Sequence, residues 1–208
     1  MTSIRIVALT TVVAIFVASV VAQESEALII DPEQTTITLN VGRAGVFAFA
    51  GHDHEVVAPA LQGQITLDRS NISRSTVSVT FEASALKVTG KGEPSEDVPE
   101  VQRVMLSDQV LDVQRHPTIT FQSRRVSVVK QSANQMTLGI TGDLTLHGVT
   151  RPLNVPMTVQ LAADGLRATG RAIVQQSQFG IRPVTAGAGT VRVKDEVEVV
   201  LSVTARRP

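Results

Sequence analysis

The chain contains no cysteine, no tryptophan and no tyrosine, and its only aromatic residues are phenylalanines. Without cysteine it can form neither a disulfide framework nor a zinc knuckle, and it cannot carry a c-type haem or a lipidated cysteine. Basic and acidic residues balance at 19 each, whereas a general nucleic-acid binder needs an excess of Lys and Arg. The best surfaces for stacking bases, Trp and Tyr, are missing as well. We therefore expect no nucleic-acid partner.

Signatures of common enzymes are also missing from the sequence. It has no G-x-S-x-G elbow, no phosphate-cradling P-loop and no G-x-G-x-x-G segment after a strand. We therefore expect no catalytic residues and no enzymatic activity. With 43% hydrophobic and 18% charged residues, the composition is that of a globular protein, and 208 residues suit one domain with a large core.

Residues 1–22 have the layout of a secretory signal peptide. Arg5 precedes an apolar run over 6–21, small residues end at Ala22, and the chain turns polar at Gln23. The alternative is an uncleaved anchor, but the run is shorter than the roughly 20 apolar residues of a spanning helix. We therefore expect a mature single domain over 23–208, secreted or periplasmic, with no stable membrane anchor after cleavage.

Most of the remaining chain alternates apolar and polar residues with a period of two. Alternation of this kind places one face of a strand in an apolar interior and the other in water. The alternating segments are separated by turn residues, for example at 68–71, 147–148, 163–165 and 187–189. This pattern predicts an antiparallel sandwich or barrel. The alternating apolar positions begin with Ile37, Leu39 and Val41, recur around 65–67, 77–81, 119–121, 138–146 and 155–161, and end with Val197, Val199, Leu201 and Val203.

One segment, near residues 97–111, indicates a short helical insertion. Asp97 and Glu100 have the spacing of a capping box, and Pro99 falls in the first helical turn, where its missing N–H costs little. Ser107 is placed to cap a second short helix through Leu111. A helical insertion in a barrel often covers one mouth.

Three segments in this strand set resemble the YceI-like family of lipid- or polyisoprenoid-binding proteins. They are His-Pro-Thr-Ile-Thr-Phe-Gln-Ser at 116–123, Thr-Gly-Asp-Leu-Thr-Leu-His-Gly-Val-Thr-Arg-Pro-Leu at 141–153, and Ser-Gln-Phe-Gly-Ile at 177–181. The second is the most specific, and the resemblance covers roughly residues 28–204. One segment departs from the family pattern: residues 52–55 read His-Asp-His-Glu, where many members carry a single His.

The resemblance implies an all-β fold, an eight-stranded antiparallel lipocalin-like barrel with a long apolar tube. The tube would hold an isoprenoid, a quinone or a similar amphiphile, without a further cofactor, in a protein that is commonly periplasmic and for which a homodimer would be unsurprising. From the residues themselves, the inward aliphatic set can equally fill the barrel. The expected tube lining is Phe47, Phe49, Val79, Phe81, Ile119, Phe121, Leu144, Leu146 and Phe179.

Polar residues at one mouth are the expected contacts for a lipid head group: His52, His54, His147 and Arg151. Each also has a plain structural interpretation. His52 and His54 fit a polar turn after a glycine, His147 fits a hairpin turn before Gly148, and Arg151 fits an exposed strand position. His116 precedes Pro117 and is interpreted only as an extended entry into a strand.

Two other functions remain open at this stage. His52 and His54, with Glu55 and His147, could bind a metal, although two His at this spacing are frequent by chance, and we assign no metal ligand. A filled barrel could act through its surface, in interaction or stress protection. The leading hypothesis is a non-catalytic, periplasmic or secreted protein that binds a hydrophobic small molecule.

Overall fold

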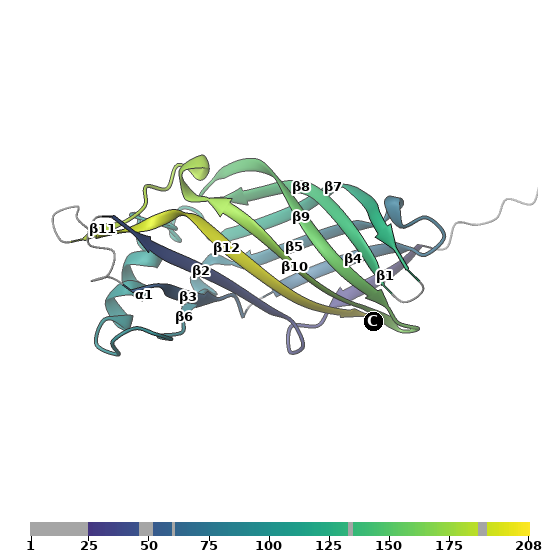
Figure 1. The fold of residues 1–208 in the computed structure, drawn as a ribbon, viewed down its shortest axis with the longest axis horizontal. Helices are drawn as coiled ribbons and strands as arrows, with labels where there is room; N and C mark the ends of the chain where they lie inside the picture. The colour runs from purple at the N-terminus through teal and green to yellow at the C-terminus, as the bar shows by residue number, and fades with distance from the viewer. Residues whose placement is uncertain (1–24, 46–51, 60, 133–134, 187–190) are drawn as a thin grey trace, which may run out of the picture.

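The computed structural model describes residues 25–45, 52–59, 61–132, 135–186 and 191–208 (Figure 1). The expected signal peptide, Phe47 and Phe49 lie outside these ranges. The described residues form one α-helix, α1 (Val98–Leu106), and three short 3-10 helices, η2 (Ile72–Arg74), η3 (Ala83–Ala85) and η4 (Gln176–Phe179). The strands within the same ranges are β1 (Ser25–Ile30), β2 (Thr36–Ala44), β3 (His54–Val57), β4 (Leu61–Asp68), β5 (Thr76–Glu82), β6 (Lys87–Val88), β7 (Thr118–Gln131), β8 (Met136–Leu146), β9 (Val149–Leu161), β10 (Gly165–Gln175), β11 (Thr185–Ala186) and β12 (Val191–Arg206).

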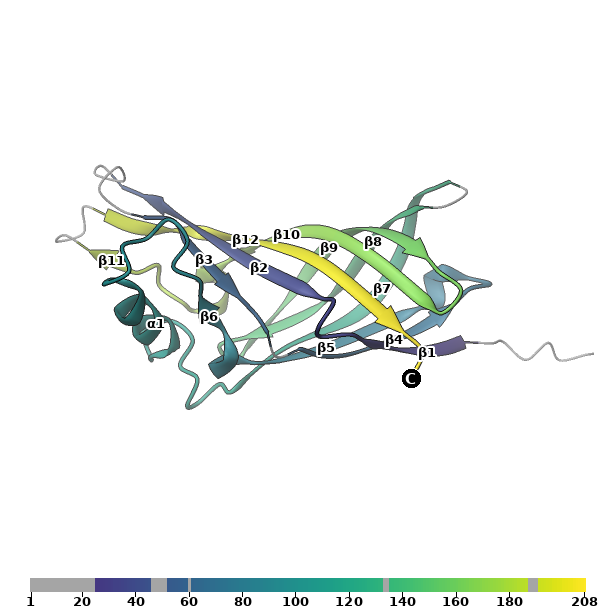
Figure 2. The same cartoon turned by 90° about the horizontal axis from the view of Figure 1, so that it is seen from below.

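Eight antiparallel strands close into a barrel, which confirms the predicted fold class (Figures 1 and 2). The order is β1-β4-β5-β7-β8-β9-β10-β12, and the end of β12 returns to β1 through the pairs Ile29↔Arg206 and Ile30↔Ala205. The earlier part of β12 pairs with β2 instead, and β3 and β6 continue the sheet from there. Because β1 and β2 share β12 in this way, the barrel widens toward the end that carries α1 (Figure 2).

The inner face follows the alternation that the sequence predicts. Leu28 is completely buried, whereas its neighbour Ile29 is 46% exposed, because successive side chains of a strand point to opposite faces. The pattern is hardest to see in β10, which was not among the predicted strands, because its inward residues include Ala168 and Ala172. Small inward residues carry a weaker hydrophobic signal than Val or Leu, although they pack in the same core.

The helical insertion is shorter than expected. It ends at Leu106, and residues 107–111 form turns rather than a second helix. The Ser107 hydroxyl donates to the Val104 carbonyl at 2.8 Å, which closes α1, and accepts from the Gln109 backbone N–H at 3.3 Å, but only turns follow it. The expected capping box is also wrong: the Asp97 side chain makes no cap hydrogen bond, and Glu100 pairs with Arg103 at 2.6 Å. In the described ranges, no helix has the length and apolar character needed to cross a bilayer.

Ion pairs hold the barrel seam beside β1. Glu26 accepts from Arg69 Nε at 2.5 Å and from Arg207 Nε at 2.7 Å, which ties β1 to the segment after β4 and to the C-terminus. Burial of Glu26 acts to raise its pKa, but the hydrogen bonds from Arg207 and Arg69 outweigh it, so the pKa lies below its ordinary value. The carboxylate is therefore ionised at neutral pH.

Candidate ligand cavity and its mouth

A cavity of about 290 Å³ runs inside the barrel. This volume is near the lower end of the range for small-molecule sites, roughly 300–1,000 Å³. A solid barrel, which was one of the alternatives open from the sequence, would have no such space. Six of the residues expected to line a tube do line the cavity: Val79, Phe81, Ile119, Phe121, Leu144 and Leu146.

Phe179 lies elsewhere than expected. It is 3% exposed and packs in a cluster with Leu144, Val174 and Ile181, but it is not among the residues that line the cavity. Its side chain belongs to η4, which crosses from β10 and leaves the barrel wall. Phe179 therefore fills the space between the wall and η4, and its neighbour Ile181 reaches the cavity instead.

The cavity wall offers almost no polar group to a ligand. Ser75 and Gln176 are its only polar residues within the described chain. Both are already engaged, because Ser75 Oγ accepts from the Asp68 backbone at 3.0 Å and Gln176 Nε2 donates to the Lys194 carbonyl at 2.8 Å. A charged group placed inside would lose its hydration without finding partners. The interior therefore suits an apolar chain, and any polar head must lie at an end.

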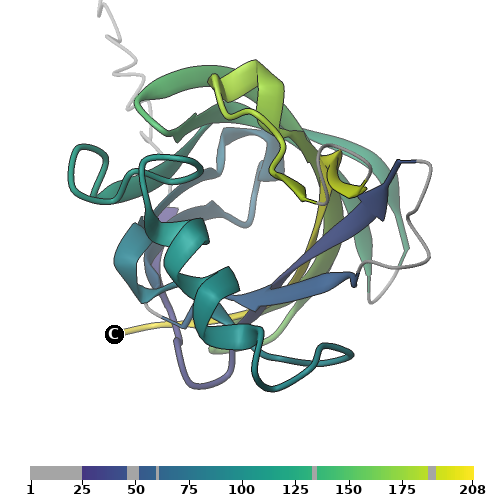
Figure 3. The same cartoon turned by 90° about the vertical axis from the view of Figure 1, so that its left-hand side faces the viewer.

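Different elements stand at the two ends of the cavity. Ile72 of η2 contributes at the end near the C-terminus, whereas Met105 of α1, with Val110 and Leu111 of the following turn, contributes at the other. Figure 3 looks onto the second end, where α1 and its following loop cross in front of the barrel. We call this end the α1 mouth.

His147 and Arg151, two of the expected head-group residues, are both anchored to η4 at the α1 mouth. His147 Nδ1 lies 3.2 Å from the carbonyl oxygen of Phe179, and Arg151 Nε donates to the carbonyl of Gln178 at 3.1 Å. The strand register sets Arg151 opposite Leu144, which lines the cavity, so both belong to the inner face of the sheet. The exposed Arg151 thus places a positive charge just beyond the apolar lining.

His52 and His54 do not join this group. His54 Nδ1 lies 2.9 Å from Glu93 Oε2, an almost fully buried carboxylate, although the angle is not that of a hydrogen bond. Glu55 pairs with Lys91 at 2.8 Å. Across the described residues, no metal-binding group of three includes His52, His54 or Glu55. The structure therefore gives no support to a metal site built on His52 and His54, which the sequence had left open.

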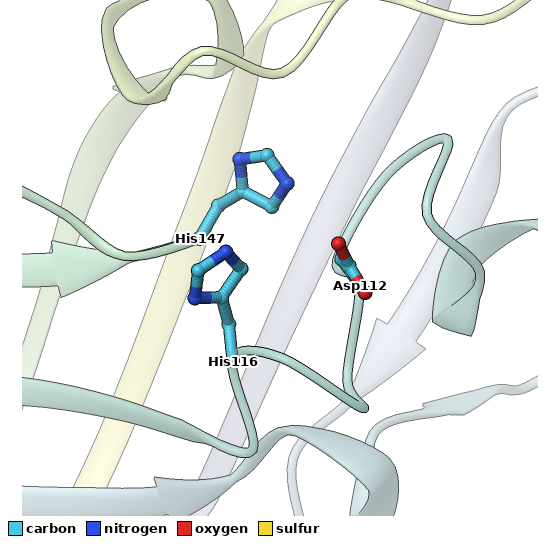
Figure 4. Close-up of side chains that lie close together, drawn as sticks. All are labelled: Asp112, His116 and His147. Carbon is cyan, nitrogen blue, oxygen red and sulfur yellow. The ribbon is translucent and has the colours of Figure 1, made fainter.

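A different cluster, which sequence reasoning missed, lies at the α1 mouth. One ligand atom each from Asp112, His116 and His147 lies within 4.8 Å of the others (Figure 4). Asp112 and His116 come from the loop between α1 and β7, and His147 from the turn between β8 and β9. The hydrogen bond from Arg115 opposes the effect of burial and lowers the pKa of Asp112 below its ordinary value.

The sequence positions of the two histidines could have predicted that they lie close together. His116 stands just before β7 and His147 just after β8, and these consecutive strands are antiparallel partners. The start of one strand in such a pair lies beside the end of the next, so the two His must share an edge. The ring centres lie 4.9 Å apart, at an angle of 67°. Asp112 had no comparable signal, because it depends on how the loop folds back.

Comparison with known proteins places the chain in a family. The YceI-like domain matches residues 28–205, nearly all of the described barrel. The chain belongs to the YceI-like domain family. A UPF0312 protein of Pseudomonas aeruginosa (strain LESB58) is 31% identical over 151 residues, which are 70% of each protein. A UPF0312 protein of Pseudomonas syringae pv. tomato is 35% identical over 82 residues, 36% of this chain and 41% of that protein.

Solved structures of YceI-like barrels share the fold at low identity. BcnA of Burkholderia cenocepacia aligns with a TM-score of 0.65 and 16% identity over 84% of this chain and 98% of its own. A polyisoprenoid binding domain from Saccharophagus degradans, implicated in plant cell wall breakdown, aligns with a TM-score of 0.62 and 12% identity, over 87% and 98%. The YceI protein of Campylobacter jejuni aligns with a TM-score of 0.58 and 14% identity, over 74% and 84%.

Proposed function

We propose that this protein is a non-catalytic, periplasmic or secreted carrier that holds the apolar chain of an isoprenoid, a quinone or another long-chain amphiphile inside its barrel. The observation that carries the proposal is the cavity, whose only polar residues in the described chain already make hydrogen bonds within the wall. The Saccharophagus degradans neighbour, described as a polyisoprenoid binding domain, supports the same ligand class. The signal-peptide pattern of residues 1–22 supports the location.

The cavity is large enough to enclose a medium-length chain. On the cavity-volume measure a water-sized group needs roughly 10–15 Å³, which is less than its share of liquid volume. A cavity of about 290 Å³ therefore holds on the order of twenty carbon-sized groups. A longer isoprenoid would need the wall to expand or would leave part of its chain outside the mouth.

The same estimate indicates that burial of the chain supplies most of the affinity. Each buried methylene contributes about 0.8 kcal/mol, so twenty contribute ~15 kcal/mol before several kcal/mol of ordering cost are subtracted. Micromolar binding requires about 8 kcal/mol net. Contacts with a head group at an end of the cavity would add to this. At the α1 mouth, Arg151 offers a cation to an anionic or strongly polar head.

Filling the cavity tests this function. Ala168 lines the cavity, and its neighbour Thr169 is exposed on the outer face. We expect Ala168→Phe to abolish or weaken by at least about tenfold the binding of geranylgeraniol or of a dansylated undecanoic acid, because the ring occupies the ligand's volume. Thr169→Phe adds the same ring outside and should bind both probes like the unchanged protein. Fluorescence titration measures both.

A second variant pair covers the case in which the larger ring prevents folding. Val79→Asp places a charge in the apolar wall, and Ser78→Asp places it on the exposed face of the same strand. Circular dichroism establishes which variants fold. Undiminished uptake of both probes in a folded Ala168→Phe or Val79→Asp protein would refute binding inside the barrel, as would failure of the unchanged protein to take up either probe.

A further inference from the structure

We infer that Asp112, His116 and His147 at the α1 mouth form a binding site for one divalent transition-metal ion of the zinc type. Two imidazole nitrogens and one carboxylate oxygen, within 4.8 Å of one another, are the donor set of many zinc and non-haem metal sites. Three protein ligands leave at least one coordination position for water or another small ligand. This inference stands independently of the proposed lipid function.

The spacing requires a small closing movement. Ligand atoms about 2.1 Å from one ion can be at most ~4.2 Å apart, and about 3.4 Å apart in a tetrahedron. The described atoms, within 4.8 Å of one another, therefore need to approach by at most roughly 0.5–1.5 Å when an ion binds. Figure 4 shows the three side chains converging from two separate segments, so small side-chain rotations can provide that approach.

The hydrogen bond of His147 fixes which of its nitrogens can bind an ion. The Phe179 carbonyl oxygen, 3.2 Å from Nδ1, can only accept. Nδ1 therefore carries the proton, and the lone pair is on Nε2. Metal-binding histidines usually donate their other N–H to a backbone carbonyl or a carboxylate, which orients the ring and raises its basicity. His147 already has this arrangement without any ion.

Asp112 is prepared in a similar way. Its side chain is 6% exposed, and Arg115 pairs with Oδ2 from a side chain that is 74% exposed. A ligating carboxylate is commonly held by such a second hydrogen bond. The remaining lone pairs can face the ion, and solvent screens the guanidinium charge. The backbone N–H of His116 also donates to the Asp112 carbonyl at 2.8 Å, which fixes the two ligands relative to each other.

The backbone conformation fixes the positions of two of the three ligands. Among the described residues, the non-glycine residues with positive φ are Asp112 at 46° and His147 at 51°. Both belong to the cluster. At His147 this conformation belongs to the hairpin turn shared with Gly148. The next residue after His147, Gly148, has no Cβ, and a Cβ there would lie 2.6 Å from Cε1 of the His116 ring. The turn therefore gives His116 room to approach.

Titration with zinc alone tests the site. We expect chelator-treated protein to bind one Zn²⁺ per chain in calorimetry, and to give a Co²⁺ absorption band that Zn²⁺ displaces. Asp112→Asn and His147→Asn keep a side chain that tolerates positive φ, and each should weaken binding by at least about tenfold. His116→Gln should do the same. The matched control is His52→Ala, which removes a histidine outside the cluster and should leave binding unchanged.

Resonances of the unchanged protein provide a readout that needs no variant. We expect Zn²⁺ to shift the imidazole ¹⁵N signals of His116 and His147 while those of His52 and His54 stay in place. Absence of saturable zinc binding would overturn the inference. So would full binding in folded Asp112→Asn and His147→Asn proteins, loss of binding in His52→Ala, or unmoved His116 and His147 signals.

Discussion

The His116 and His147 rings meet edge to face, with their centres 4.9 Å apart, at the mouth of an otherwise apolar barrel. The hairpin turn of His147 and Gly148 makes this contact because both residues have positive φ, 51° and 72°. Two such residues form the turn that best matches the twist of paired strands. The same turn therefore connects β8 to β9 and places a histidine beside the loop that carries Asp112.

Gly148→Ala should destabilise the protein more than the same change at Gly92. Both glycines have positive φ, so an added Cβ costs about 1–2 kcal/mol at either position. At Gly148 the Cβ also lies 2.6 Å from His116 Cε1, whereas at Gly92 no atom lies within 4 Å. Urea unfolding measures both losses. Equal losses would show that His116 is not packed against the turn.

Leu28→Ala should cost about 2–5 kcal/mol of unfolding free energy, because it leaves a cavity in the core. Leu28 is 0% exposed, and its neighbour Ile29 is 46% exposed. Ile29→Ala is the matched control and should cost well under half as much. The urea midpoint should fall with an unchanged slope in Leu28→Ala. Similar losses in the two variants would contradict the inward register assigned to β1.

Glu26→Gln should make the protein less stable at neutral pH by roughly 1 kcal/mol, since partly exposed ion pairs contribute little. The folded pKa of Glu26 lies below its ordinary value of 4.5, so the stabilisation is present above about pH 4.5 and is lost as the pH falls through the folded pKa. Urea midpoints measured between about pH 2.5 and 7 should therefore converge for the two proteins at low pH.

The partners of Glu26 supply the control for that measurement. Replacing Arg69 and Arg207 together by Gln removes the groups that lower the Glu26 pKa. In that background burial, which raises the Glu26 pKa, acts unopposed, so Glu26→Gln should no longer lower stability as the pH rises. A stability loss from Glu26→Gln that still grows from low to neutral pH without the two arginines would contradict the assignment of the seam to these ion pairs.

The alternation of apolar and polar residues predicts much of the fold, but it predicts less of the candidate site. Ile37, Leu39 and Val197 indicate inward faces because each is a large apolar residue between polar ones. Ala168 carries the same inward position with a small side chain, so the pattern there is faint. The residues that line the cavity were predictable where they are the inward-facing apolar residues of the strands. Phe179 was misplaced because η4 leaves the strand geometry just before it.

The mouth depends on tertiary contacts that periodicity does not encode. Asp112 becomes part of a cluster because its backbone N–H donates to the Ser107 carbonyl at 2.8 Å and its φ is positive, which turns the loop toward β8. His54 pairs with Glu93 from a loop far along the chain, and no local pattern indicates this. The sequence can indicate which polar residues lie near a mouth. Which of them come together depends on the tertiary structure.

Native mass spectrometry of the protein, purified from its own compartment without detergent or chelator, tests the central claim most directly. We expect a discrete additional mass that passes into organic solvent on extraction and fragments as a prenyl or acyl chain. In Ala168→Phe, whose ring would occupy the cavity that Ala168 lines, that mass should be absent, and in Thr169→Phe it should be present. A bare chain mass in the unchanged protein, or an equal load in a folded Ala168→Phe protein, would contradict a ligand inside the barrel.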